Sequence, residues 1–188
     1  MTVTRGSGLN RWLIIIIKMI YLNTSDEVSE AYKYFTWQDI VDFAEIDRSP
    51  LSFSKGMPGD WKASPTGGAG YLLVQVGGKP YWADAIGQIP YAVDTYRLFH
   101  SVEKTLETAR GWADGTPFNE YDNTNTYDNF FVLRGALYAS KRFAYTIAQN
   151  GMTYPAVNVV EQMRAVDSDS LSLPVNENEL AKYLVCAR

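Results

Sequence analysis

The chain has almost none of the side chains that metal sites and many catalytic sites require. Its 188 residues include one cysteine, Cys186, and one histidine, His100. A single cysteine excludes a disulfide within the chain and a cage of cysteine ligands for zinc. A serine or cysteine triad would depend on His100 as its base, and no serine stands in a GxSxG motif. The sequence therefore predicts no metal, no cofactor and no catalytic residue of these classes.

Positive charge is also scarce. Lysine and arginine number 17 against 21 aspartates and glutamates, which gives a formal net charge of -4 and a calculated pI near 5.0. Nucleic acids and anionic membranes attract basic surfaces, so this balance disfavours nucleic acid as a partner. A local basic patch is still compatible with this negative net charge.

Long hydrophobic runs are missing too. The most apolar stretch, residues 11–22 (RWLIIIIKMIYL), is shorter than the roughly 20 residues needed to cross a bilayer, and Lys18 interrupts it. No small-x-small cleavage site follows, as a signal peptide would require. Four consecutive isoleucines instead favour a buried strand, because their branched Cβ atoms suit an extended backbone. We expect no membrane span and a location in the cytoplasm or a virion, with secretion left open.

What is present is the composition of a folded domain. Hydrophobic residues make up 46% of the chain and charged residues 20%, with aromatic residues along its whole length. A chain of this size commonly forms one compact domain. We therefore expect a single domain over residues 1–188.

Apolar residues spaced by three or four predict several helices. Small residues at Gly135, Ala136 and Ala139 would let a second helix approach one of them closely, and Asn176 with Glu179 would form a capping box at the last one. The expected helices cover residues 23–35, 89–109, 127–149, the segment from about 155 to 166, and the segment that follows Asn176.

Strand and loop signals complete the prediction. Residues 71–86 read as a β-hairpin that turns through Gly77 and Gly78, where glycine permits a positive φ. Residues 54–70 hold five glycines and two prolines, and we expect a long internal loop there. The predicted fold is a mainly helical α+β domain with a small antiparallel sheet made by the N-terminal strand and the hairpin.

Residues 36–56 (TWQDIVDFAEIDRSPLSFSKG) suggest two short helices around a turn. The pattern resembles the helix-turn-helix of lactose-repressor-type regulators, with Thr36 as the first cap and Asp47 as the second. The resemblance implies that side chains near the start of the second helix, around Leu51, would enter the major groove. Four acidic residues in the stretch oppose that use near phosphates. The alternative is a helical hairpin that contributes Trp37, Ile40 and Phe43 to the core.

A carboxylate-dependent hydrolase of the glycosidase type is the catalytic alternative, because it needs only two suitably spaced acids and aromatic platforms for sugar. The sequence supplies both kinds of residue, although acidic and amide residues in loops more often form turns. Candidate platforms and acids are Trp61, Trp82, Trp112, Tyr121, Tyr127, Asp84, Asp114, Glu120, Asp122 and Asp128.

A non-enzymatic structural or interaction subunit of a multi-protein assembly is the function that we favour, with a viral (phage) particle as the expected setting. On the 127–149 helix, aromatic and basic residues alternate at helical spacing, a composition that suits a protein interface. The isoleucine-rich strand could complete a sheet in a partner. The partners would be other protein subunits, identical or different. The predicted interface residues are Phe131, Arg134, Tyr138, Lys141, Arg142, Tyr145, Ile14 and Ile16.

Overall fold

The computed structural model describes residues 33–46, 49–69, 71, 73–114, 123–146 and 160–184. In chain order the elements are β1 (Lys33–Phe35), α2 (Trp37–Asp42), η2 (Phe43–Ile46), η3 (Pro50–Phe53), β2 (Leu73–Val76), β3 (Lys79–Trp82), α3 (Ala83–Phe99), α4 (Val102–Asp114), α5 (Asn123–Arg142), β4 (Phe143–Thr146), β5 (Val160–Met163), η5 (Ser168–Ser172) and α6 (Glu177–Leu184). The predicted mainly helical α+β fold is confirmed. The expected strand at 11–22 lies outside the described residues.

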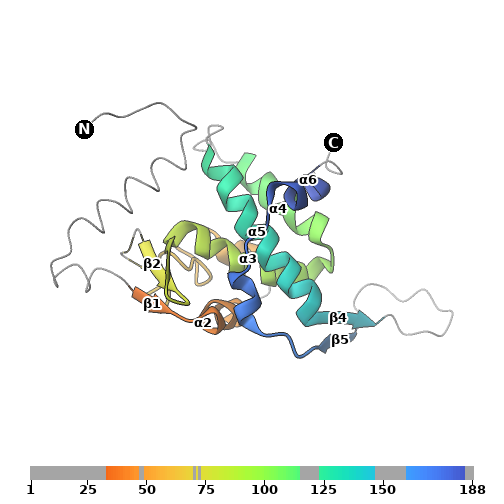
Figure 1. The fold of residues 1–188 in the computed structure, drawn as a ribbon, viewed down its shortest axis with the longest axis horizontal. Helices are drawn as coiled ribbons and strands as arrows, with labels where there is room; N and C mark the ends of the chain where they lie inside the picture. Colours follow the sequence, from red (N-terminus) through yellow and green to blue (C-terminus); the bar gives the residue numbers. More distant parts are fainter. Residues whose placement is uncertain are drawn as a thin grey trace.

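The helices α3 and α5 form the centre of the described chain (Figure 1). They approach closely because α5 presents small residues to α3, as the sequence predicts. A Cβ atom on Gly135 would lie 2.8 Å from the carbonyl oxygen of Ile89, and Ala136 and Ala139 are fully buried. None of the helices in the described ranges combines the length and the hydropathy needed to cross a membrane.

The three-stranded sheet has the order β1-β2-β3. Strands β2 and β3 form the predicted hairpin, in which Gly77 and Gly78 have φ angles of 56° and 77°. A Cβ atom on Gly77 would lie 2.7 Å from the indole nitrogen of Trp37, so close packing also requires glycine there. Strand β1 pairs with β2 in parallel, which makes the sheet mixed rather than wholly antiparallel.

The predicted helix over residues 23–35 is wrong at its C-terminal end, because Lys33–Phe35 form β1. Tertiary contacts outweigh the helical periodicity there. The ring of Phe35 packs 5.1 Å from that of Trp61, and the Lys33 ammonium group donates to the carbonyl oxygen of Gly67 at 2.5 Å. Residues 23–32 lie outside the described residues.

The glycine-rich segment between η3 and β2 runs through turns that close around Trp61, which is 2% exposed. A Cβ atom on Gly68 would overlap the Trp61 ring at 2.5 Å. The glycines therefore let the backbone wrap a large core side chain.

The expected continuous helix over 89–109 is two helices, because His100 adopts the left-handed conformation at φ 51°. The backbone N–H of His100 donates to the Tyr96 carbonyl and ends α3, and Ser101 then accepts from the Lys104 N–H at the start of α4. The apolar stripe itself continues across the break, since Val102 and Leu106 on α4 are buried.

The expected helices over 127–149 and from about 155 are also partly wrong. Helix α5 ends at Arg142, and Phe143–Thr146 pair with Val160–Met163 in an antiparallel two-stranded sheet. Met163, within the segment expected to be helical, is on β5 and is 65% exposed. The predicted capping box of α6 is confirmed, since the N–H of Asn176 donates to Glu179 and the N–H of Glu179 donates to Asn176.

Candidate protein-interaction surface

The predicted interface on α5 divides into a buried half and an accessible half. Phe131, Arg134 and Tyr138 are 3%, 8% and 4% exposed, because they pack within this chain. They are therefore part of the interior and are not presented to a partner in this conformation. Their alternation with apolar residues at helical spacing reflects a helix buried on more than one side.

Arg134 shows why an arginine can belong to this interior. Its guanidinium carbon lies 5.0, 5.5 and 5.9 Å from the ring centroids of Phe131, Trp37 and Tyr81. Its Nη2 donates a hydrogen bond to the carbonyl oxygen of Leu171. Aromatic faces stabilise a cation, and the carbonyl satisfies a donor, so this charge holds α5 against α2, the hairpin and η5.

The other predicted residues on α5 and β4 remain accessible. Lys141 is exposed, Arg142 is half-buried and Tyr145 is 45% exposed. The Arg142 guanidinium donates to the carbonyl oxygen of Arg164, which ties the end of α5 to the segment after β5. The predicted interface residues Ile14 and Ile16 lie outside the described residues.

The β4–β5 pair is attached to the end of α3 by a second buried arginine. Arg97 is 7% exposed, and its Nε donates to Oε1 of Glu161 on β5 at 2.9 Å. Its Nη1 lies 3.0 Å from Oε1 of Glu45, and its guanidinium carbon lies 4.7 Å from the centroid of the Phe143 ring on β4. Sequence reasoning missed this residue, because its two acids are far away in the sequence.

His100, which follows α3, packs its ring against Tyr145 on β4 and against Tyr96 on α3. Its ring centroid lies 4.7 Å from that of Tyr145 and 6.1 Å from that of Tyr96. Burial raises the pKa of Tyr96, the nearby Tyr145 adds to the increase, and Arg164 opposes it. A backbone in a sparsely populated conformation thus positions the histidine between two tyrosines.

Large apolar side chains are accessible beside these contacts. Phe99 is 43% exposed and Met163 is 65% exposed. Met163 pairs with Phe143, and Tyr145 pairs with Glu161, so these side chains stand on the same face of β4–β5. We define the hairpin-end surface as Phe99, Lys141, Arg142, Tyr145, Met163 and Arg164.

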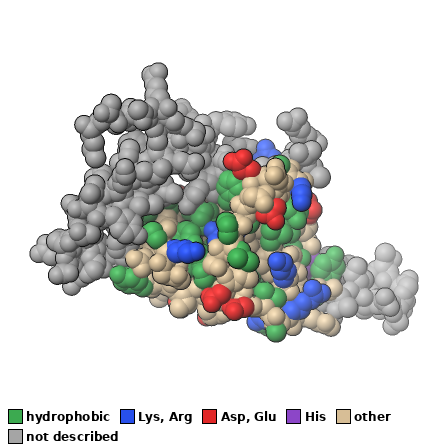
Figure 2. Space-filling model, in the orientation of Figure 1, with side chains coloured by type: hydrophobic (Ala, Val, Ile, Leu, Met, Phe, Trp, Pro, Cys, Tyr) green, Lys and Arg blue, Asp and Glu red, His purple; other side chains and the backbone are tan. Residues whose placement is uncertain are grey.

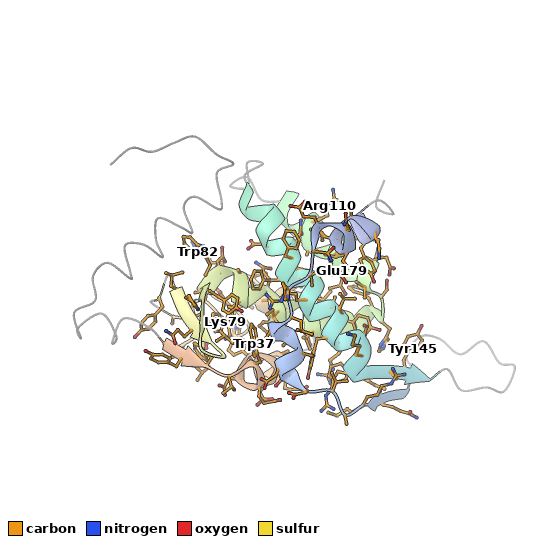
Figure 3. All side chains as sticks on the ribbon, in the orientation of Figure 1. Trp37, Lys79, Trp82, Arg110, Tyr145 and Glu179 are labelled. Atoms are coloured by element: carbon orange, nitrogen blue, oxygen red, sulfur yellow. The ribbon has the colours of Figure 1, made fainter. Side chains whose placement is uncertain are left out.

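The hairpin-end surface lies at the opposite end of the described chain from the β1–β3 sheet (Figure 1). Figure 2 shows Lys and Arg side chains near this end beside hydrophobic ones, and Figure 3 places Tyr145 there. Exposed Arg, Tyr and Met residues next to one another are typical of protein interfaces. The arrangement can hold a partner by apolar contact and by charge.

The residues of the helix-turn-helix resemblance are arranged differently from a DNA reader. Thr36 caps α2 as expected, in a capping box with Asp39, and Trp37, Ile40 and Phe43 are buried as the core alternative predicts. The second segment, η3, is a 3-10 helix of four residues. A recognition helix presents several successive side chains to the groove, and one 3-10 turn provides little length for this.

Two of the residues of the hydrolase alternative make structural contacts, and the side chains of Trp112, Asp114, Glu120, Tyr121, Asp122 and Tyr127 lie outside the described residues. Trp61 is in the core, and Asp84 forms an ion pair with Lys62 at 2.6 Å. Trp82 is half-buried. In the described ranges, no three His, Cys, Asp or Glu side chains are grouped so that they could hold a metal ion.

Comparisons with known proteins found no matching family model, no matching curated protein and no matching solved structure.

Proposed function

We propose that this protein is a non-enzymatic interaction subunit of a protein assembly and that it binds a protein partner through the hairpin-end surface. The main support is that Tyr145 and Met163 are exposed on β4–β5 and that Lys141 and Arg164, exposed cations, lie close to them in the chain. Exposed apolar groups grouped on a folded domain mark contact sites more often than isolated ones do. The proposal does not depend on whether the assembly is a virus particle.

The attachment of β4–β5 to α3 also supports partner binding through the hairpin-end surface. The contacts of Arg97 with Glu161 and Phe143 fix β4–β5 against α3, so a partner would meet a preformed surface. A preformed surface loses less conformational entropy on binding than a mobile one. The cations would favour a partner whose facing surface is acidic.

The full-length protein can be tested with Met163→Glu, which places a carboxylate in an exposed apolar position. Leu173→Glu is the matched control, because Leu173 is 67% exposed and lies outside the hairpin-end surface. We expect the natural protein to form a defined complex, with itself or with a partner purified from its source, by light scattering. Met163→Glu should weaken that complex by about tenfold or more, and Leu173→Glu should not, since central apolar contacts dominate interface energies.

Two results would contradict the proposal. One is a natural protein that stays monomeric and binds no purified component of its source. The other is a complex that both glutamate variants form equally well while retaining their helical circular dichroism.

A further inference from the structure

The connection from β5 to η5, residues 164–167, begins in the hairpin-end surface, and we call it the charged strip. Three of its four side chains are exposed and the fourth is half-buried. The backbone N–H of Arg164 donates to the carbonyl oxygen of Arg142 at 2.7 Å, which fixes one end. The backbone N–H of Ser170 donates to the carbonyl oxygen of Asp167 at 3.1 Å, which fixes the other end. The charged strip is therefore an exposed segment that the fold holds in place.

The two ends of the charged strip carry opposite charges. Arg164 is an exposed cation, and Asp167 is an exposed acid three residues later. Oδ1 of Asp167 accepts from the backbone N–H of Asp169 at 2.9 Å, and its second carboxylate oxygen can accept a further hydrogen bond. Between the charges lie the apolar residues Ala165 and Val166. A partner that fits the strip therefore needs an acid at one end and a cation at the other.

A second acid lies near the acidic end of the charged strip. Burial raises the pKa of Tyr138, and the Arg142 cation opposes this change. The carboxylates of Asp42 and Asp167 add to the increase, so both act on the same hydroxyl. Figure 2 shows acidic side chains and Lys or Arg side chains near one another on this part of the surface, between α2 and β4–β5. The molecule thus presents both signs of charge side by side.

Antiparallel alignment of the charged strip with its own copy brings opposite charges together. With a two-fold axis between Ala165 and Val166, Arg164 of each copy faces Asp167 of the other. The symmetry repeats the contact, so one pair of positions gives two ion pairs with apolar side chains at the centre. Parallel alignment would instead set Arg164 against Arg164. The order of the residues therefore selects the antiparallel arrangement.

We propose that a second copy of this chain is the partner of the hairpin-end surface, related to the first by a two-fold axis at Ala165 and Val166. This inference rests on the proposed function and names the occupant of that surface. The overall charge agrees with it, because the surface cations favour an acidic partner and each copy has a formal net charge of -4. Tyr145 and Met163, both exposed, add apolar contact on each side of the axis.

Complementary charge reversals in the full-length protein test the two-fold axis. In a dimer of Arg164→Glu alone, each contact sets two acids against each other, and in a dimer of Asp167→Lys alone it sets two cations against each other. In a mixed dimer of the two variants, both contacts again join opposite charges. We expect each variant alone to weaken self-association by about tenfold in light scattering, and an equimolar mixture to return to within about threefold of the natural protein.

Two further variants separate charge complementarity from other effects. Glu177→Lys is the matched control, because it reverses an exposed acid on α6, which lies away from β5 in Figure 1, and it should leave self-association unchanged. Asp167→Lys also removes the cap of η5, whereas asparagine is an equally good cap. Asp167→Asn should therefore keep the circular dichroism of the natural protein and still weaken self-association by about threefold.

The outcomes distinguish this inference from the proposed function. A natural protein that stays monomeric overturns the inference. If that monomer still binds a purified component of its source and Met163→Glu weakens the binding, the proposed function stands with a different occupant. A dimer that is insensitive to both charge reversals, or a mixture of the two variants that regains no affinity, also overturns the two-fold arrangement.

Discussion

Arg97 and Arg134 are both buried, and the molecule compensates their charges in different ways. Arg97 faces two carboxylates, Glu45 and Glu161, from η2 and β5. Arg134 faces aromatic rings and the carbonyl oxygen of Leu171. The first environment carries full opposite charges, and the second carries only partial ones.

This difference separates what each arginine does for the fold. Removing Arg97 would leave a carboxylate that is itself largely buried, because the side chain of Glu161 is 17% exposed. Removing Arg134 would leave the carbonyl oxygen of Leu171 without its arginine donor and three rings without a cation above them. No buried carboxylate would lose its counter-charge there. We infer that the position of β4–β5 depends on the ion pair of Arg97 more than the packing of α5 against η5 depends on Arg134.

The substitutions Arg97→Met and Arg134→Met test this difference most directly, because methionine keeps a long apolar side chain and removes the charge. We expect Arg97→Met to lower the free energy of unfolding by about 3–5 kcal/mol, because the Glu161 carboxylate loses its arginine partner at a largely shielded site. Arg134→Met should cost about 1–3 kcal/mol, the usual effect of an orphaned buried acceptor. Urea denaturation measures both, and equal losses would show that the two environments are energetically alike.

A smaller effect distinguishes the two acids around Arg97. Glu161→Ala removes the better shielded partner and should destabilise by about 2 kcal/mol, since hydrogen bonds to charged groups contribute about 1.5–3 kcal/mol. Glu45 is 54% exposed, and Glu45→Ala should cost no more than about 1 kcal/mol, as exposed ion pairs do. Thermal unfolding of the two variants checks the order. A larger loss from Glu45→Ala would mean that η2, rather than β5, is the element that Arg97 holds.

The smallest effect concerns the backbone between α3 and α4. His100→Gly and His100→Ala both remove the ring contact with Tyr145, but only glycine adopts φ 51° without strain. We expect His100→Gly to be more stable than His100→Ala by about 1 kcal/mol, the usual cost of the left-handed conformation. The matched pair cancels the loss of the ring, so denaturant midpoints report the backbone alone. Equal midpoints would show that the helix break does not require this conformation.

Local chemistry made several parts of the fold predictable. Gly77 and Gly78 set the hairpin turn, Asn176 and Glu179 set the start of α6, and Gly135 marks the approach of α3 to α5. Each of these depends on neighbours in the sequence or on the size of a single side chain. Pattern reasoning is strongest for such features.

The candidate site was predictable only in part. Helical spacing placed Lys141, Arg142 and Tyr145 in the predicted interface, although Tyr145 is on a strand. The same spacing grouped the buried Phe131 and Arg134 with them, because periodicity separates the faces of a helix but does not say which faces are covered within the chain. Phe99 and Met163 carried no local signal.

By itself the sequence determined the class of the molecule: a mainly helical α+β chain with few groups for proton transfer or metal binding and with its turns placed by glycine. Tertiary structure decided where helices end and which charges are buried. The strand at Phe143 depends on contacts between segments far apart in the chain, such as its pairing with β5 and the ion pair of Arg97 with Glu161. Such contacts outweigh local propensities of a few tenths of a kcal/mol per residue. The order of residues along the chain does not reveal which distant segments will meet.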